Sequence, residues 1–170
     1  MLPKSYLVWK WTVYGLATLL LFALQHLLLD HVRLWGAAPF LYPMLPAVLA
    51  SYEGLQRGSL FGLVLGVVCD ALILGPFDGF YTLLFTLIAL FSALIAENLL
   101  SPGLLCGLVV SAMALLACAG ARMALELLGG NRALFLMLRL LLLETALTLP
   151  ALAVVLPLYR TVHRRCAADY

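Results

Sequence analysis

Long apolar runs, broken only by short polar turns, constrain this chain more than any other feature of its sequence. Hydrophobic residues make up 65% of its 170 residues and charged residues only 11%, whereas a soluble domain carries roughly 25% charged residues. So few charges cannot cover a surface that faces water. The composition therefore predicts one integral membrane domain over residues 1–170, with the lipid bilayer as its solvent.

The apolar runs divide into six candidate transmembrane helices, each approaching the roughly 20 residues that a span needs. We expect them at about Trp11–Leu29, Ala37–Tyr52, Ser59–Leu74, Gly79–Ala96, Pro102–Ala121 and Ala133–Tyr159. The second segment is rich in proline, which predicts a short or kinked helix, and two prolines interrupt the sixth. The predicted fold is therefore all-α, a polytopic membrane bundle of about six helices.

The distribution of Lys and Arg predicts the orientation, because cytoplasmic loops of membrane proteins carry an excess of both. An even number of spans puts the two termini on one side. With both termini cytoplasmic, six basic residues are cytoplasmic: Lys4, Lys10, Arg57, Arg160, Arg164 and Arg165. Four fall outside or near the outer face: Arg33, Arg122, Arg132 and Arg139. The net charge of +2 is small and predicts no nucleic-acid partner.

No set of residues has the spacing that catalysis or metal binding requires. The four cysteines form no close pair, and three of them lie in apolar runs, where cysteine acts as a small hydrophobe. Asp70, Glu144, His26 and the serines match no known spacing for nucleophilic or metal chemistry. We therefore expect no catalytic residue, no metal and no cofactor.

A stripe of glycines marks the third predicted helix. Gly58, Gly62 and Gly66 are four residues apart and share one face of a helix. Without side chains on that face another backbone can approach closely, which is a common way for helices to associate in lipid. The stripe predicts close packing, either within this chain or against a partner's helix.

The next step of four beyond the stripe lands on an acid, Asp70. An ionised acid near the bilayer centre costs about 2.5–3.5 kcal/mol, so Asp70 needs a partner or stays protonated. Asp70 lies about 17 Å along its helix from the inner side, and Arg139 about 12 Å below the outer side. In a core about 30 Å thick these depths nearly coincide, which predicts an Asp70–Arg139 pair. The alternative is that Arg139 extends outward to the headgroups.

Three further polar residues are candidates for the interior of the bundle. Glu144 lies five residues from Arg139, on another face of the same helix, so it pairs elsewhere or stays protonated. Gln25 and His26, near the outer end of the first helix, are expected to form interhelical hydrogen bonds.

The stretch "GLVLGVVCDALILGPFDGFYTLLFTLIALFSAL" resembles the core of the MreD family of rod-shape-determining membrane proteins. That core has the pattern G-x-x-x-G-x-x-x-D, followed by a short Gly-containing turn with Pro and Phe or Leu, and then another apolar helix. The matching residues here are Gly62, Gly66, Asp70, Gly75, Pro76, Phe77 and Gly79. Asp78 departs from the pattern, because the family often runs directly from the apolar residue to the glycine.

The resemblance implies a function and partners. MreD proteins are non-catalytic scaffolds of the bacterial cell-elongation machinery, in the inner membrane, and they help control cell shape and peptidoglycan synthesis. They bind the bitopic protein MreC and, through it, are associated with MreB, RodA and a class B penicillin-binding protein. Their fold is similar to that of the substrate-binding subunits of energy-coupling-factor transporters. The turn Gly75–Gly79 would then lie at the outer surface, beside an extracytoplasmic partner.

Two alternatives from other functional classes remain open at this level. The chain has the length and helix number of a substrate-binding subunit of an energy-coupling-factor vitamin transporter, with polar groups such as Gln25 and Glu144 lining a pocket. It could also be an intramembrane enzyme or proton-coupled carrier, with Asp70 or Glu144 as the proton site.

Overall fold

The computed structural model describes residues 4–27, 39–73, 75–100, 103–129 and 134–168. These residues form α-helices joined by short turns, and the described ranges contain no strand. The all-α class that the sequence predicts is therefore confirmed. Several predicted helix ends lie outside the described residues: Leu29, Ala37, Leu74, Pro102 and Ala133.

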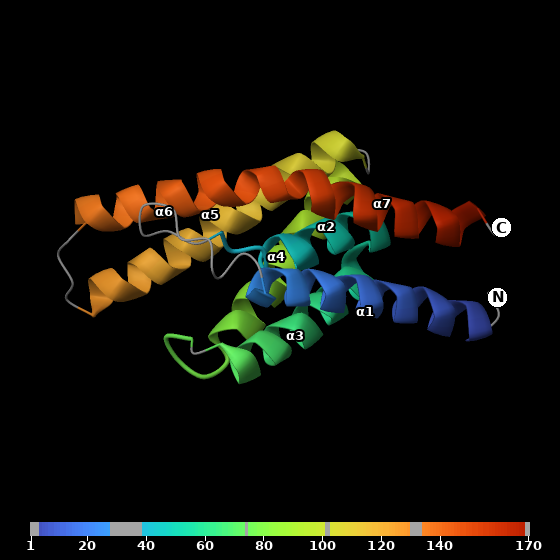
Figure 1. Cartoon of the computed structure of the whole chain (residues 1–170), viewed down its shortest axis with the longest axis horizontal. Helices are drawn as coiled ribbons and strands as arrows, with labels where there is room; N and C mark the ends of the chain where they lie inside the picture. Colours follow the sequence, from blue (N-terminus) through green and yellow to red (C-terminus); the bar gives the residue numbers. More distant parts are fainter. Residues whose placement is uncertain (1–3, 28–38, 74, 101–102, 130–133, 169–170) are drawn as a thin grey trace.

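The helices form an up-and-down bundle. Their order is α1 (Lys4–Leu27), α2 (Met44–Glu53), α3 (Leu55–Leu72), α4 (Phe80–Asn98), α5 (Leu104–Leu128), α6 (Leu134–Thr148), the 3-10 turn η2 (Leu149–Ala151) and α7 (Leu152–Ala168). Figure 1 shows that each helix from α2 to α6 runs opposite to the helix before it, whereas α7 continues the line of α6. The start of α1 and the end of α7 therefore lie at the same end of the bundle.

Three of the described helices are long and apolar enough to cross a membrane, namely α3, α4 and α5. The sequence predicts six spans, and the other helices fall short for physical reasons. α2 has 10 residues and measures about 15 Å, half of a hydrocarbon core about 30 Å thick. α6 has 15 residues, and α1 carries Lys10 near one end and Gln25 and His26 at the other.

α2 is the centre of the bundle. Residues Met44 to Ser51 are all buried, and α2 packs against α3, α4, α5 and α7. A helix that is apolar on every side belongs in such a core. It begins at Met44, later than the predicted Ala37, because Pro43 occupies its N-cap and fixed φ angles at Pro39 and Pro43 keep the preceding segment irregular.

Two side chains satisfy the backbone of that irregular segment. Gln25, whose exposure is 1%, donates from Nε2 to the carbonyl of Pro39 (2.7 Å) and accepts from the backbone N–H of Leu41 (3.1 Å). The N–H of Phe40 donates to Oγ1 of Thr148 (3.0 Å). Gln25 is thus buried, as the sequence predicts, and it bonds backbone groups because non-helical backbone inside an apolar bundle needs internal partners.

The sixth predicted helix is divided in two. Pro150 lies in the 3-10 turn that separates α6 from α7, where its ring removes one N–H and displaces the carbonyl four residues earlier. Pro157 lies inside α7 without ending it. The second half continues to Ala168, beyond the predicted end at Tyr159.

Glu53, the last residue of α2, holds the end of the bundle where α1 begins and α7 ends. Its side chain is only 2% exposed. Lys10 Nζ lies 2.6 Å from Oε1, the Tyr14 hydroxyl donates at 2.9 Å, His163 Nδ1 lies at 3.2 Å and Arg57 Nη1 lies 3.7 Å from Oε2. The carboxylate therefore joins α1, α2, α3 and α7. Sequence analysis missed this role because Glu53 precedes a glycine and resembles a turn residue.

The charge of Glu53 is stabilised by these partners. Burial raises the pKa of Glu53, but hydrogen bonds from Lys10, Tyr14 and His163 and the charge of Lys10 outweigh burial, so the pKa falls below its ordinary value of 4.5. Because the pKa of Glu53 is lower in the folded state than in the unfolded state, ionised Glu53 stabilises the fold at pH values above its ordinary pKa. That stabilisation is lost as the pH falls through the folded-state pKa.

We predict that Glu53→Gln lowers the free energy of unfolding by about 3 kcal/mol at pH 7, because it leaves Lys10 buried without its counter-charge. Thermal unfolding of the full-length protein in detergent measures the loss. The difference from the wild type should shrink as the pH falls below 4.5, because the wild-type carboxylate is then protonated too. Asp78→Asn, which neutralises an exposed acid, is the matched control. A pH-independent difference would contradict the ionic role of Glu53.

Candidate functional site

The glycine stripe of α3 lies directly against the backbone of α4. A Cβ added at Gly62 would lie 2.7 Å from the carbonyl oxygen of Phe85, and one added at Gly66 would lie 2.5 Å from Cα of Thr82. Both are backbone atoms that a side chain cannot push aside. Even alanine is therefore excluded at these positions unless α3 and α4 move apart.

The third glycine of the stripe contacts α2 in the same way. A Cβ added at Gly58 would lie 2.5 Å from Cβ of Ala50, and Gly58 is buried. The stripe is thus covered by α2 and α4 of this chain. The sequence predicted that the stripe packs either within this chain or against a partner's helix. The structure shows packing within the chain at Gly58, Gly62 and Gly66, so the prediction that a partner's helix covers this stripe is wrong.

Asp70 caps the N-terminus of α4 from the neighbouring helix. Its Oδ1 accepts from the backbone N–H of Tyr81 (2.9 Å), and its Oδ2 accepts from the N–H and the hydroxyl of Thr82 (2.9 and 2.6 Å). The first N–H groups of any helix lack partners within the helix, and a carboxylate there also complements the helix dipole. The acid in the motif therefore locks α3 to the start of α4.

Gly79 explains why the cap comes from another helix. Gly79 is the N-cap residue of α4 and has a φ of +86°, a conformation that glycine adopts without strain. Having no side chain, it cannot cap the helix itself. Asp70 supplies the oxygens that a Ser or Asp at that position would otherwise provide.

The turn that joins α3 to α4 projects from the bundle. Pro76, Phe77 and Asp78 are exposed, and Phe77 is 48% exposed. The ring of Phe77 meets that of Phe80 edge-on, with centroids 5.4 Å apart. Gly75, half-buried, lies beside the ring of Tyr81. The turn is therefore held at its base and exposed at its tip.

The predicted Asp70–Arg139 pair is not formed. Both residues are described, and both oxygens of Asp70 bond α4, whereas Arg139 is exposed on α6. The prediction compared only depths along two helices. The amides of α4 are closer because α4 follows α3 after a short turn and packs along its length. An exposed Arg139 agrees with the alternative that its side chain points outward.

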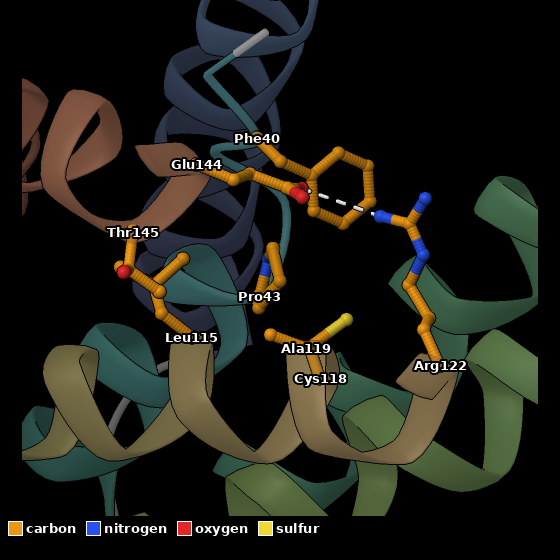
Figure 2. A pocket seen from close by; sticks show the side chains of 8 residues that line it. All are labelled: Phe40, Pro43, Leu115, Cys118, Ala119, Arg122, Glu144 and Thr145. Carbon is orange, nitrogen blue, oxygen red and sulfur yellow. Dashed lines mark hydrogen bonds and ion pairs between the residues drawn. The ribbon is translucent and has the colours of Figure 1, made fainter. Parts of the chain in front are cut away.

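Glu144 is paired with Arg122 instead, which joins α6 to α5. Arg122 Nη1 donates to Glu144 Oε1 at 3.3 Å, and the Arg122 guanidinium also lies 5.6 Å from the ring centroid of Phe40. Figure 2 shows Arg122 reaching from α5 towards Glu144, with the Phe40 ring beside the pair and Pro43 and Cys118 lining the space below it. Arg122 lies on α5 beyond its predicted end at Ala121, and the sequence analysis therefore placed it outside or near the outer face rather than in a helix.

His26 is exposed rather than buried, which corrects its predicted place in the interior. Its Nε2 lies 3.1 Å from the hydroxyl of Tyr42, and its ring packs against Phe22 with centroids 5.4 Å apart. His26 therefore links α1 to the segment before α2, at the rim of the core. The position near the helix end, next to the charged run "DHVR", was the signal for this exposure.

The remaining residues that could take part in chemistry are the cysteines and the potential metal ligands of the described ranges. Cys69, Cys106 and Cys118 are buried free thiols, which agrees with their interpretation as small hydrophobes. No group of three or more His, Cys, Asp or Glu side chains in the described ranges is arranged to hold a metal ion.

Comparison with known proteins gives no family for this arrangement: no family model, no curated protein and no solved structure matches the chain. The three apolar helices are consistent with a membrane protein. Membership of the MreD family therefore stays a prediction from the motif.

We predict that Gly62→Ala and Gly66→Ala each lower the free energy of unfolding by about 1–3 kcal/mol, because the added methyl group forces α3 away from α4. Gly120→Ala is the matched control, since a Cβ there meets no atom within 4 Å. It should be neutral or slightly stabilising, because alanine favours helix more than glycine does. Thermal unfolding in detergent compares the three variants, and equal stabilities would refute the close contact.

Replacing Asp70 should also destabilise the hairpin, in graded steps. Asp70→Asn keeps one acceptor oxygen and should cost about 1–2 kcal/mol, whereas Asp70→Leu leaves the α4 amides without partners and should cost about 3 kcal/mol. Thr82→Val, which removes only the hydroxyl donor, should cost about 1 kcal/mol. Arg139→Leu is the control. If Arg139→Leu destabilises the protein as much as Asp70→Leu, the result would support an Asp70–Arg139 ion pair and contradict the helix cap.

Proposed function

We propose that this chain is a non-catalytic integral membrane scaffold of the bacterial cell-elongation machinery, which binds MreC and helps control cell shape and peptidoglycan synthesis. The supporting observation is that each part of the motif has a structural role in one helical hairpin, formed by α3 and α4. Gly62 and Gly66 allow α3 and α4 to touch, Asp70 fixes the start of α4, and the turn between the helices is exposed. Such a hairpin suits the presentation of a rigid surface.

The exposed turn is the surface that we assign to MreC. Phe77 offers an aromatic side chain that is half exposed, and aromatic residues dominate the energetics of protein interfaces. The turn is held at its base by Asp70 and by the ring contact with Phe80. A surface held in one conformation loses little entropy on binding. Through MreC the chain would be associated with MreB, RodA and a class B penicillin-binding protein.

We further propose that the chain crosses the inner membrane several times and that both of its termini are cytoplasmic. The start of α1 and the end of α7 lie at one end of the bundle (Figure 1). Lys10, Arg57 and His163 gather there around Glu53. An excess of Lys and Arg favours the cytoplasmic side. The turn lies at the opposite end of α3, about 27 Å away, and would face the extracytoplasmic side.

We predict that Phe77→Ser lowers the recovery of MreC with this chain at least tenfold, because an aromatic hot spot at the centre of an interface contributes about 2 kcal/mol or more. The measurement is affinity purification of the full-length chain coexpressed with MreC from the same genome. The free energy of unfolding should fall by no more than about 1 kcal/mol, the value of the ring contact with Phe80, because Phe77 is otherwise half exposed.

Leu99→Ser is the control for this experiment, because Leu99 is 76% exposed and lies just beyond the opposite end of α4. It should leave the recovery of MreC unchanged. Failure of the wild-type chain to retain MreC would refute the scaffold. Equal recovery with both variants would refute only the assignment to the turn. A reporter fused after Tyr170 tests the orientation and should be active in the cytoplasm.

A further inference from the structure

A cleft of about 350 Å³ opens beside the base of the α3–α4 turn. It is lined by two turn residues, one residue of α4 and three of α5: Gly75, Pro76, Tyr81, Arg122, Leu125 and Glu126. Its volume lies within the range of small-ligand sites, about 300–1,000 Å³. The lining brings together a hydroxyl, a cation and an anion.

These three polar groups retain unused hydrogen-bonding capacity. Tyr81 is only 3% exposed, and its hydroxyl bonds to no residue in the described ranges. Arg122 uses Nη1 for Glu144 and its side chain is 41% exposed. Figure 2 shows its other terminal nitrogen pointing away from Glu144. Glu126 is exposed and forms no ion pair with a described residue. A hydroxyl, a guanidinium and a carboxylate that converge on one cleft with this capacity unused point to a polar ligand.

The depth of the cleft matches the headgroup region of a bilayer. α5 is one of the three helices able to cross a membrane, and its 25 residues measure about 37 Å. That length exceeds the hydrocarbon core, about 30 Å, so the helix ends reach the polar interface. Arg122 lies about 9 Å and Glu126 about 3 Å from the end of α5. With the excess length shared between the two ends, Glu126 lies at the edge of the core and the backbone of Arg122 about 5 Å inside it. The long side chain of Arg122 reaches from there towards the level of the lipid phosphates.

We propose that this cleft binds a phosphate ester that carries a primary amine, the headgroup chemistry of phosphatidylethanolamine. The phosphate accepts hydrogen bonds from the free Arg122 nitrogens and the Tyr81 hydroxyl, and the ammonium group pairs with Glu126. Leu125 contacts the lipid below the headgroup. Glu144 already neutralises part of the charge of Arg122, and Glu126 repels an anion. The site therefore selects a zwitterionic headgroup over phosphatidylglycerol.

Native mass spectrometry of the full-length protein in detergent tests this site, with phosphatidylethanolamine and phosphatidylglycerol added at equal concentration. The wild type should bind phosphatidylethanolamine about tenfold more tightly. Glu126→Gln should abolish that preference, and Tyr81→Phe should weaken binding of phosphatidylethanolamine about tenfold. Asp78→Asn is the matched control, because it removes an equal charge from the neighbouring α3–α4 turn, at a residue that does not line the cleft. It should preserve both affinity and preference.

Soluble phosphoethanolamine, added as a competitor, identifies the source of the ligand. Displacement of the lipid at a similar concentration assigns the site to a free phosphate ester, whereas failure to displace it assigns the site to the bilayer. Either result supports the recognition chemistry. Equal binding of the two lipids would overturn the proposal, and so would variants of Tyr81 and Glu126 that bind as the Asp78→Asn control does. A vitamin retained in the cleft in place of lipid would overturn it as well.

Discussion

The hydrogen-bonding demand of backbone groups inside an apolar bundle is the constraint on which this structure depends. Wherever a helix starts or the chain turns irregular within the core, an N–H or a carbonyl loses its helical partner, and leaving it unsatisfied costs several kcal/mol. The chain meets this demand with side chains from neighbouring helices. Gln25 and Thr148 bond the segment before α2, and Asp70 bonds the start of α4.

Because the polar side chains serve the helix starts and the irregular segment, the middle of the bundle is held together by close packing. The two charged clusters lie apart, with Glu53 and its partners at the end where α1 begins and Arg122 with Glu144 towards the end where α5 stops. Between them, α3 touches α2 and α4 through glycines. Close backbone contact supplies the packing that the hydrophobic effect does not supply between helices in lipid.

The two proposed functional surfaces meet at the turn between α3 and α4. Gly75 and Pro76 line the cleft beside Arg122, and Phe77, which follows them directly, projects from the same turn. A headgroup in the cleft would therefore pack against the base of the segment that we assign to MreC. Lipid binding and partner binding would then share one structural element, and each would restrict the conformations available to the other.

The sequence by itself determined the local features of this protein. Long apolar runs marked the helices, prolines predicted a short or kinked α2 and an interrupted sixth helix, and glycines spaced by four predicted a close contact on α3. The tertiary structure alone decided which groups meet. Asp70 bonds the amides of α4 rather than Arg139, Glu53 is a buried junction, and Glu144 meets Arg122. The physical reason is that helix formation depends on neighbours along the chain, whereas the partner of a polar side chain depends on how each helix is rotated and on which backbone groups its packing leaves without partners.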